Sequence, residues 1–114
     1  LTLEKNGSTL VERCSVADRF QDRLVGLMGR EALAKDAALL IVPCNSVHSF
    51  FMRFQIDVVY LSGDFNSKKL RILSVRQAMK PWRMHLPVKG ATAVLEMCAG
   101  KAVELSRGDA ICIS

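Results

Sequence analysis

The sequence predicts an α+β fold built from short strands, tight turns and one main helix. Asn6-Gly7 stands between two strand-like runs, Leu1–Lys5 and Ser8–Cys14. Asn-Gly favours a two-residue hairpin because both turn residues need a positive φ. Ala17–Met28 carries apolar side chains at helical spacing, and further runs rich in β-branched and aromatic residues are typical of strands.

The main helix is expected over Ala17–Met28. Ser15, with Asp18 three residues later, forms a variant capping box, in which the hydroxyl accepts an unpaired N–H and the carboxylate favours the positive end of the helix. Gly29 is a natural residue to end it. The apolar stripe consists of Phe20, Leu24, Leu27 and Met28.

Strands are expected along the rest of the chain, separated by turn chemistry. Ser62–Ser67 makes a second hairpin, Gln77–Gly90 is expected to be a structured loop, and Gly100–Ser106 one helical turn. The expected strands are Ala37–Val42, Val47–Met52, Ile56–Leu61, Leu70–Val75, Thr92–Cys98 and Ala110–Ile113.

Length and composition predict a single domain over residues 1–114. Half of the residues are hydrophobic and 24% are charged, which is ordinary for a globular protein. No apolar run reaches the roughly 18 residues of a transmembrane helix. The first residue is Leu1, so a signal peptide or an anchor could precede it, and the compartment stays open between cytoplasm and periplasm or exterior.

The cysteines indicate free thiols. None of the four forms C-x-x-C, so a zinc knuckle is unsupported, and the sequence indicates no cofactor. Two disulfides with three connectivities remain arithmetically possible. Free thiols are favoured because most of the cysteines stand in apolar, strand-like runs, where Cys behaves as a small hydrophobe.

The stretch Cys44–Leu61 is the most apolar part of the chain, yet it carries several polar side chains. Asp57 is the most informative, because Asp is depleted in strands and is almost never buried unless paired. We expect its carboxylate to accept backbone N–H groups or to pair with Arg53 or His48. It would then either tie down an adjacent loop or face a ligand.

The order of these signals resembles the domain-of-unknown-function 192 family. The matching motifs are R-L-V-G-L-M-G-R at Arg23–Arg30, H-S-F-F-M-R-F-Q-I-D-V-V-Y-L at His48–Leu61, V-L-E-M-C-A-G at Val94–Gly100 and R-G-D at Arg107–Asp109. Gln55 stands where the family usually has Pro, and Met97-Cys98 where it often has Leu-Pro. The resemblance implies mostly antiparallel strands curled into a small barrel-like sheet with the helix packed against it. It implies no established reaction, and many relatives look exported or lipid-anchored.

The first functional hypothesis is a non-catalytic module that binds a small ligand or a protein partner. Polar groups that converge on an apolar pocket with an aromatic wall are typical of small-molecule sites. Arg53 would clamp a carboxylate or phosphate, and Trp82 would stack on a sugar or a base. The alternative is that the histidine is a core residue and the tryptophan a plug. The candidate residues are His48, Ser49, Met52, Arg53, Asp57 and Trp82.

The second hypothesis is binding to an acidic surface such as nucleic acid or an anionic partner. Residues 64–90 carry seven basic and one acidic side chain, so this segment holds the whole basic excess of a chain with net charge +5. Basic patches beside aromatic residues suit phosphate contact and stacking, although a solvated basic face is the ordinary alternative. The patch consists of Lys68, Lys69, Arg71, Arg76, Lys80 and Arg83.

Two further chemistries are weaker. Cys44, His48 and Met52 are spaced by four, so on one long strand they would share a face with donors that suit copper. Cys44, His48 and Asp57 offer a thiol nucleophile and a base. Pro43 and Asn45 argue for a turn at Cys44, and no oxyanion-hole glycine motif lies near it, so the sequence leans against an enzyme.

Overall fold

The structure, a computed structural model, describes residues 1–17, 33–48 and 54–114. Its strands form one eight-stranded sheet in the order β2-β1-β8-β6-β5-β7-β4-β3. The elements are β1 (Leu3–Lys5), β2 (Ser8–Val11), β3 (Arg13–Ala17), β4 (Ala37–Ile41), β5 (Ile56–Asp64), the 3-10 helix η1 (Phe65–Ser67), β6 (Lys69–Met79), β7 (Ala93–Cys98) and β8 (Ala110–Ile113).

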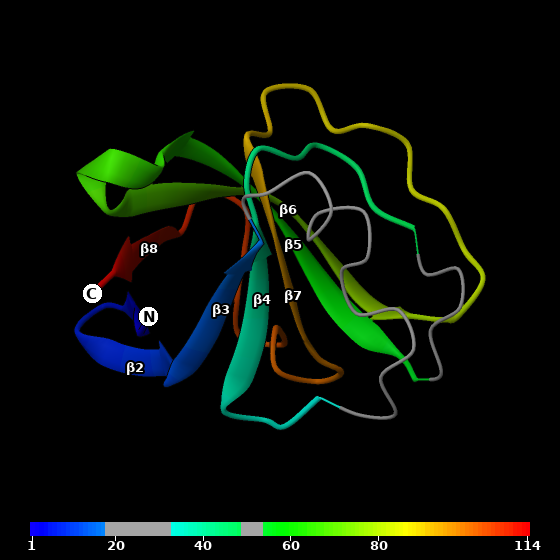
Figure 1. Cartoon of the computed structure of the whole chain (residues 1–114), viewed down its shortest axis with the longest axis horizontal. Helices are drawn as coiled ribbons and strands as arrows, with labels where there is room; N and C mark the ends of the chain where they lie inside the picture. Colours follow the sequence, from blue (N-terminus) through cyan, green and yellow to red (C-terminus); the bar gives the residue numbers. More distant parts are fainter. Residues whose placement is uncertain (18–32, 49–53) are drawn as a thin grey trace.

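The long β5–β6 hairpin spans the molecule, with its tip at η1 lying on the same side as β8 and both chain ends (Figure 1). Two bulges interrupt its register, one between Tyr60 and Leu61 and one between Ile56 and Val58. A bulge bends a strand and increases its twist. Within the described part, β3 and β4 pair in parallel and the other pairings are antiparallel.

The sheet buries side chains on both faces. We call the cluster around Val59 and Leu95 the first core and the cluster around Val58 and Val94 the second core. Successive side chains on a strand point to opposite faces, so these neighbouring valines and leucines fall into different cores. β7 is therefore buried over nearly its whole length, with a fully buried Met97 and only Cys98 partly exposed.

The expected α+β class is wrong for the described residues. These residues are almost all strand, and their only helical element is η1. Ser15, the expected N-cap, lies in the middle of β3 opposite Leu39, and Ala17, the expected first helical residue, ends that strand opposite Ile41. The parallel pairing with an apolar β4 overrides the capping pattern, since tertiary pairing regularly outweighs local propensity. Residues 18–28 of the expected helix lie outside the described residues.

The expected barrel is also corrected, because the sheet is open, with β2 and β3 at its edges. Only Glu12 separates these two edge strands along the chain. Backbone hydrogen bonds in both directions between Leu1 and Cys14, 2.8 and 3.1 Å long, tie the start of the chain to β3. The two edges are thus held near each other without a continuous ladder between them.

The expected hairpin at Asn6-Gly7 is confirmed, and two other local expectations are corrected. Asn6 and Gly7 have φ values of 54° and 78°, and Lys5 pairs with Ser8 across them, as a two-residue hairpin requires. The expected loop from Gln77 is shorter, because β6 continues to Met79. The expected helical turn at Gly100–Ser106 is a series of turns without a helix. Among the described residues, no helix is long and apolar enough to cross a membrane.

Candidate functional site

Asp57 is fully buried in β5 and is held by backbone amides from two distant parts of the chain. Its Oδ1 accepts from the N–H of Ala78 at 2.8 Å, and its Oδ2 accepts from the N–H groups of Gly100 and Ala102, both at 2.9 Å. The carboxylate thus joins the end of β6 to the turn after β7. Hydrogen bonds from N–H groups compensate the burial of a charge, which explains how Asp57 is tolerated at this depth.

Of the sequence-predicted ligand cluster, the structure describes His48, Asp57 and Trp82, and it does not bring these three together. Asp57 lies opposite Met97 on the first-core face of the sheet, whereas Val47, beside His48, packs in the second core. His48 forms an isolated bridge with Met84, and Trp82 is 56% exposed at a φ of 63°. The remaining members, Ser49, Met52 and Arg53, lie outside the described residues, and their role stays a prediction.

The same arrangement bears on the copper and thiol hypotheses. Residues 44–47 form no strand, and the thiol of Cys44 donates to the carbonyl of Ser46 at 3.0 Å. Asp57 lies on the first-core face and accepts three backbone amides, whereas the segment of His48 adjoins the second core through Val47. Within the described residues, no group of three acidic, His or Cys side chains could hold a metal.

All four cysteines are free, as expected. Cys14 is buried, and burial raises the pKa of its thiol to about 11. Cys112 differs from the expectation for a core cysteine, because its side chain is exposed on β8.

A polar pair at the second core, between buried Tyr60 and half-buried His85, was missed by sequence reasoning. The hydroxyl of Tyr60 lies 2.8 Å from Nδ1 of His85, which arrives from the 80–92 segment. Burial raises the pKa of Tyr60 to about 12, and burial followed by the charge of Arg76 lowers the pKa of His85. Glu96, only 3% exposed, adds to the rise for Tyr60. The sequence did offer one sign of buried polar groups here, because Glu96 stands next to Leu95 in an otherwise apolar run.

The lowered pKa of His85 makes stability depend on pH. Because the folded value lies below the ordinary 6.5, the contribution of His85 is complete above pH 6.5 and is lost as the pH falls through the folded value. We expect the free energy of unfolding, measured by urea titration at several pH values, to fall below pH 6.5. His85→Asn keeps an acceptor for Tyr60 without titrating and should flatten this fall. Tyr60→Phe should retain it, because burial is the leading cause; an equally steep curve for His85→Asn would contradict the assignment.

The predicted basic patch divides among three places. Lys80 and Arg83 are exposed in the 80–92 segment, beyond the end of β6, and Lys68 is exposed at the hairpin tip with a φ of 60°. The others lie on β6 itself. They pair across the hairpin with residues of one face of β5: Lys69 with Asp64, Arg71 with Ser62 and Arg76 with Val58. We call the three side chains Lys69, Arg71 and Arg76 the basic face.

A hollow of about 480 Å³ adjoins the tip end of the basic face. Hydroxyls and small residues complete its lining beside Lys69 and Arg71. Arg71 donates one N–H to the carbonyl of Gly108 at 2.8 Å, which fixes its guanidinium at the rim. The other lining residues are Ser62, Gly63, Ser67, Leu70 and Ala110.

Among the side chains that the structure describes, which do not include that of Asp64 opposite Lys69, no ion pair to the basic face is found. The ion pairs found there join Lys5 to Asp109 and Arg13 to Asp36, both away from this face. Lys69 and Arg71 stand about 7 Å apart along the strand, which is within the Debye length of about 8 Å at physiological salt. Their fields therefore add at the hollow.

In its described part the chain is a small all-β domain. The buried carboxylate of Asp57 links two of its segments, and the basic face lies on β6. Residues 1–113 match the DUF192 family, described as "Uncharacterized ACR, COG1430". The chain belongs to this family, as its motifs indicated.

Relatives with similar sequences are themselves uncharacterised. UPF0127 protein PH1112 of Pyrococcus horikoshii is 34% identical over 86 residues, covering 71% of this chain and 68% of its own length. UPF0127 protein TK1120 of Thermococcus kodakarensis is 30% identical over 118 residues, covering 95% and 69%.

Two solved structures share the fold. A protein of unknown function from Novosphingobium aromaticivorans DSM 12444 has a TM-score of 0.79 at 22% identity, covering 96% of this chain and 81% of its own. A candidate transcription regulator from Sinorhizobium meliloti 1021 has a TM-score of 0.74 at 20% identity, covering 96% and 88%. At these identities the likeness concerns the fold alone.

Proposed function

We propose that this chain is a non-catalytic binding module whose partner is anionic, and that the basic face with its adjoining hollow is the contact surface. The observation that carries the proposal is the row of Lys69, Arg71 and Arg76 on one face of β6, beside a hollow that Lys69 and Arg71 help to line. Aligned charges of one sign raise the local concentration of an oppositely charged partner.

The phosphate backbone of a nucleic acid is the partner class that suits this surface best. Phosphates are contacted by Lys, Arg and hydroxyl groups together, and the hollow combines Lys69 and Arg71 with the hydroxyls of Ser62 and Ser67. Exposed Trp82 could add stacking only if the bound strand reaches the 80–92 segment. An acidic protein would use the same cations without needing the hydroxyls.

The test is the salt dependence of binding to a fluorescent single-stranded oligonucleotide, followed by anisotropy. If the three cations of the basic face each neutralise one phosphate, log K should fall against log salt with a slope of about −2. The double variant Lys69→Gln/Arg71→Gln should weaken binding and reduce the slope by about 1.4.

The matched control is Lys35→Gln/Lys89→Gln, which removes the same charge from exposed positions outside the basic face. It should bind almost as the unmodified protein does. Salt-independent binding, or an equal loss in the control, would contradict the proposal. Tighter binding to a poly-glutamate chain of equal charge would indicate that the partner is an acidic protein and not a nucleic acid.

A further inference from the structure

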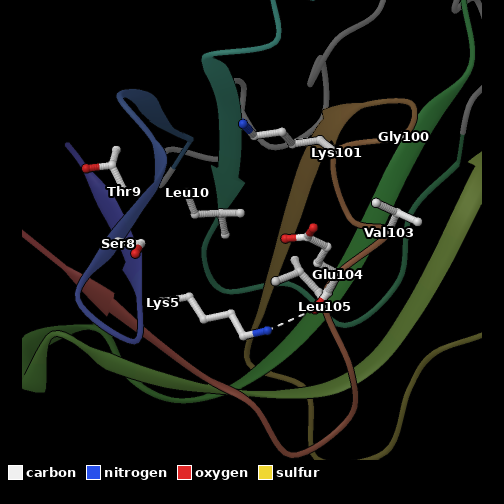
Figure 2. Close-up of a pocket in the computed structure, with 9 residues that line it drawn as sticks. All are labelled: Lys5, Ser8, Thr9, Leu10, Gly100, Lys101, Val103, Glu104 and Leu105. Carbon is white, nitrogen blue, oxygen red and sulfur yellow. Dashed lines mark hydrogen bonds between the residues drawn. The ribbon is translucent and has the colours of Figure 1, made fainter.

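A second cleft, separate from the basic face, opens between the β1–β2 hairpin and the turn that follows β7 (Figure 2). Its volume is about 250 Å³. Leu10 and Leu105, which line it from opposite sides, both pack on the first core. The cleft therefore lies at an opening above that core, and small-molecule sites are typically clefts that combine apolar lining with a few polar groups.

Both walls of the cleft are fixed before any ligand arrives. Asp57 holds the turn through the amides of Gly100 and Ala102. Lys5 links the hairpin to the same turn, since its Nζ donates to the carbonyl oxygen of Glu104 at 2.8 Å and lies 3.0 Å from Oδ2 of Asp109. A site with fixed walls loses little conformational entropy when it binds.

The turn presents one cation and one anion to the cleft. Figure 2 shows the ammonium of Lys101 and the carboxylate of Glu104 both directed toward the side where Leu10 lies. Lys5 is already paired with Asp109. Within the described residues, neither Lys101 nor Glu104 takes part in an ion pair. Two opposite charges thus remain available three residues apart, beside an apolar floor.

We propose that this cleft binds a small zwitterion, namely a free α-amino acid. The carboxylate of the ligand would pair with Lys101, its ammonium with Glu104, and its side chain would contact Leu10 and Leu105. Hydrogen bonds between charged groups are about twice as strong as neutral ones. The volume lies just below the roughly 300 Å³ at which drug-sized sites begin, which suits a ligand of about ten heavy atoms.

The direct test is a titration followed by amide chemical shifts, with L-leucine as the probe. Two analogues isolate the charges: 4-methylpentanoate lacks the ammonium, and isoamylamine lacks the carboxylate. We expect L-leucine to shift the amides of residues 8–10 and 100–105, and both analogues to bind at least about tenfold more weakly. The proposal is overturned if glycine, L-leucine and L-phenylalanine all fail to shift these amides, or if an analogue binds as well as L-leucine.

Variants separate this site from the basic face. Lys101→Met and Glu104→Gln should each weaken L-leucine binding about tenfold. Lys89→Met and Glu12→Gln, which remove the same charges from exposed positions that do not line the cleft, should leave it unchanged. Lys69→Gln/Arg71→Gln should also leave it unchanged, so failure of either site does not decide the other. Full affinity in both Lys101→Met and Glu104→Gln would refute the assignment of the charges.

Discussion

Replacing Asp57 with alanine is expected to cost more stability than any other single change in the described polar groups. The substitution strands the amides of Ala78, Gly100 and Ala102 around a buried position. A buried donor left without a partner costs about 1–3 kcal/mol, so the free energy of unfolding should fall by at least about 3 kcal/mol. For a domain with a total stability of about 5–15 kcal/mol this is a large fraction, and the Tm should drop by about 10 °C or more.

The free energy of unfolding of the conservative variant Asp57→Asn should lie between those of the unmodified protein and Asp57→Ala. Its carbonyl oxygen can still accept from Gly100 and Ala102, but its NH₂ group then faces the N–H of Ala78, and two donors cannot pair. Asp36→Ala is the matched control, because Asp36 is a surface carboxylate paired with Arg13 and should matter little. Hydrogen exchange of the three amides should accelerate in Asp57→Ala; an unchanged Tm with unchanged protection would contradict the role of Asp57.

Gly63→Ala is expected to have the second largest effect. Gly63 has a φ of +130°, and a Cβ at this position would lie 2.9 Å from the backbone oxygen of Lys69 and 3.2 Å from Cδ2 of Leu70. The strain of a positive φ and the overpacking against backbone each cost about 1–3 kcal/mol. A loss of about 2 kcal/mol or more is therefore expected from denaturant unfolding.

Gly7→Ala separates the two causes of this loss. Gly7 also has a positive φ, +78°, but no atom lies within 4 Å of the added Cβ. This variant should lose only the strain contribution, about 1 kcal/mol. Equal losses at Gly63 and Gly7 would show that the β5–β6 hairpin yields to the methyl group. Since Gly63 lines the hollow, Gly63→Ala should also weaken oligonucleotide binding.

The sequence predicted features whose causes are local. The Asn6-Gly7 hairpin depends on two residues that tolerate a positive φ, and the structure confirms it. A carboxylate among apolar strand residues must find donors, and Asp57 does accept backbone amides, one of the expected outcomes. Which amides it finds was not predictable, because Ala78 and Gly100 are 21 and 43 residues away along the chain.

Features that depend on register and bulges escaped sequence reasoning. The bulge near Tyr60 keeps Arg76 on the same face of β6 as Lys69 and Arg71, whereas strict alternation would have moved it to the other face. The pair of Tyr60 and His85 likewise depends on how the 80–92 segment folds back over the second core. At Ser15 a local signal misled the prediction: the residue pattern suits a helix cap, but the segment pairs with β4 as a strand.

We propose above that the basic face of β6 and its adjoining hollow receive an anionic partner. Amide chemical shifts recorded while a single-stranded oligonucleotide is added at low salt test it most directly. We expect the largest changes at Ser62, Gly63 and Ser67–Arg71, and we expect them to vanish in Lys69→Gln/Arg71→Gln. Changes confined to residues 80–92 and His48, or none in the hairpin, would contradict it.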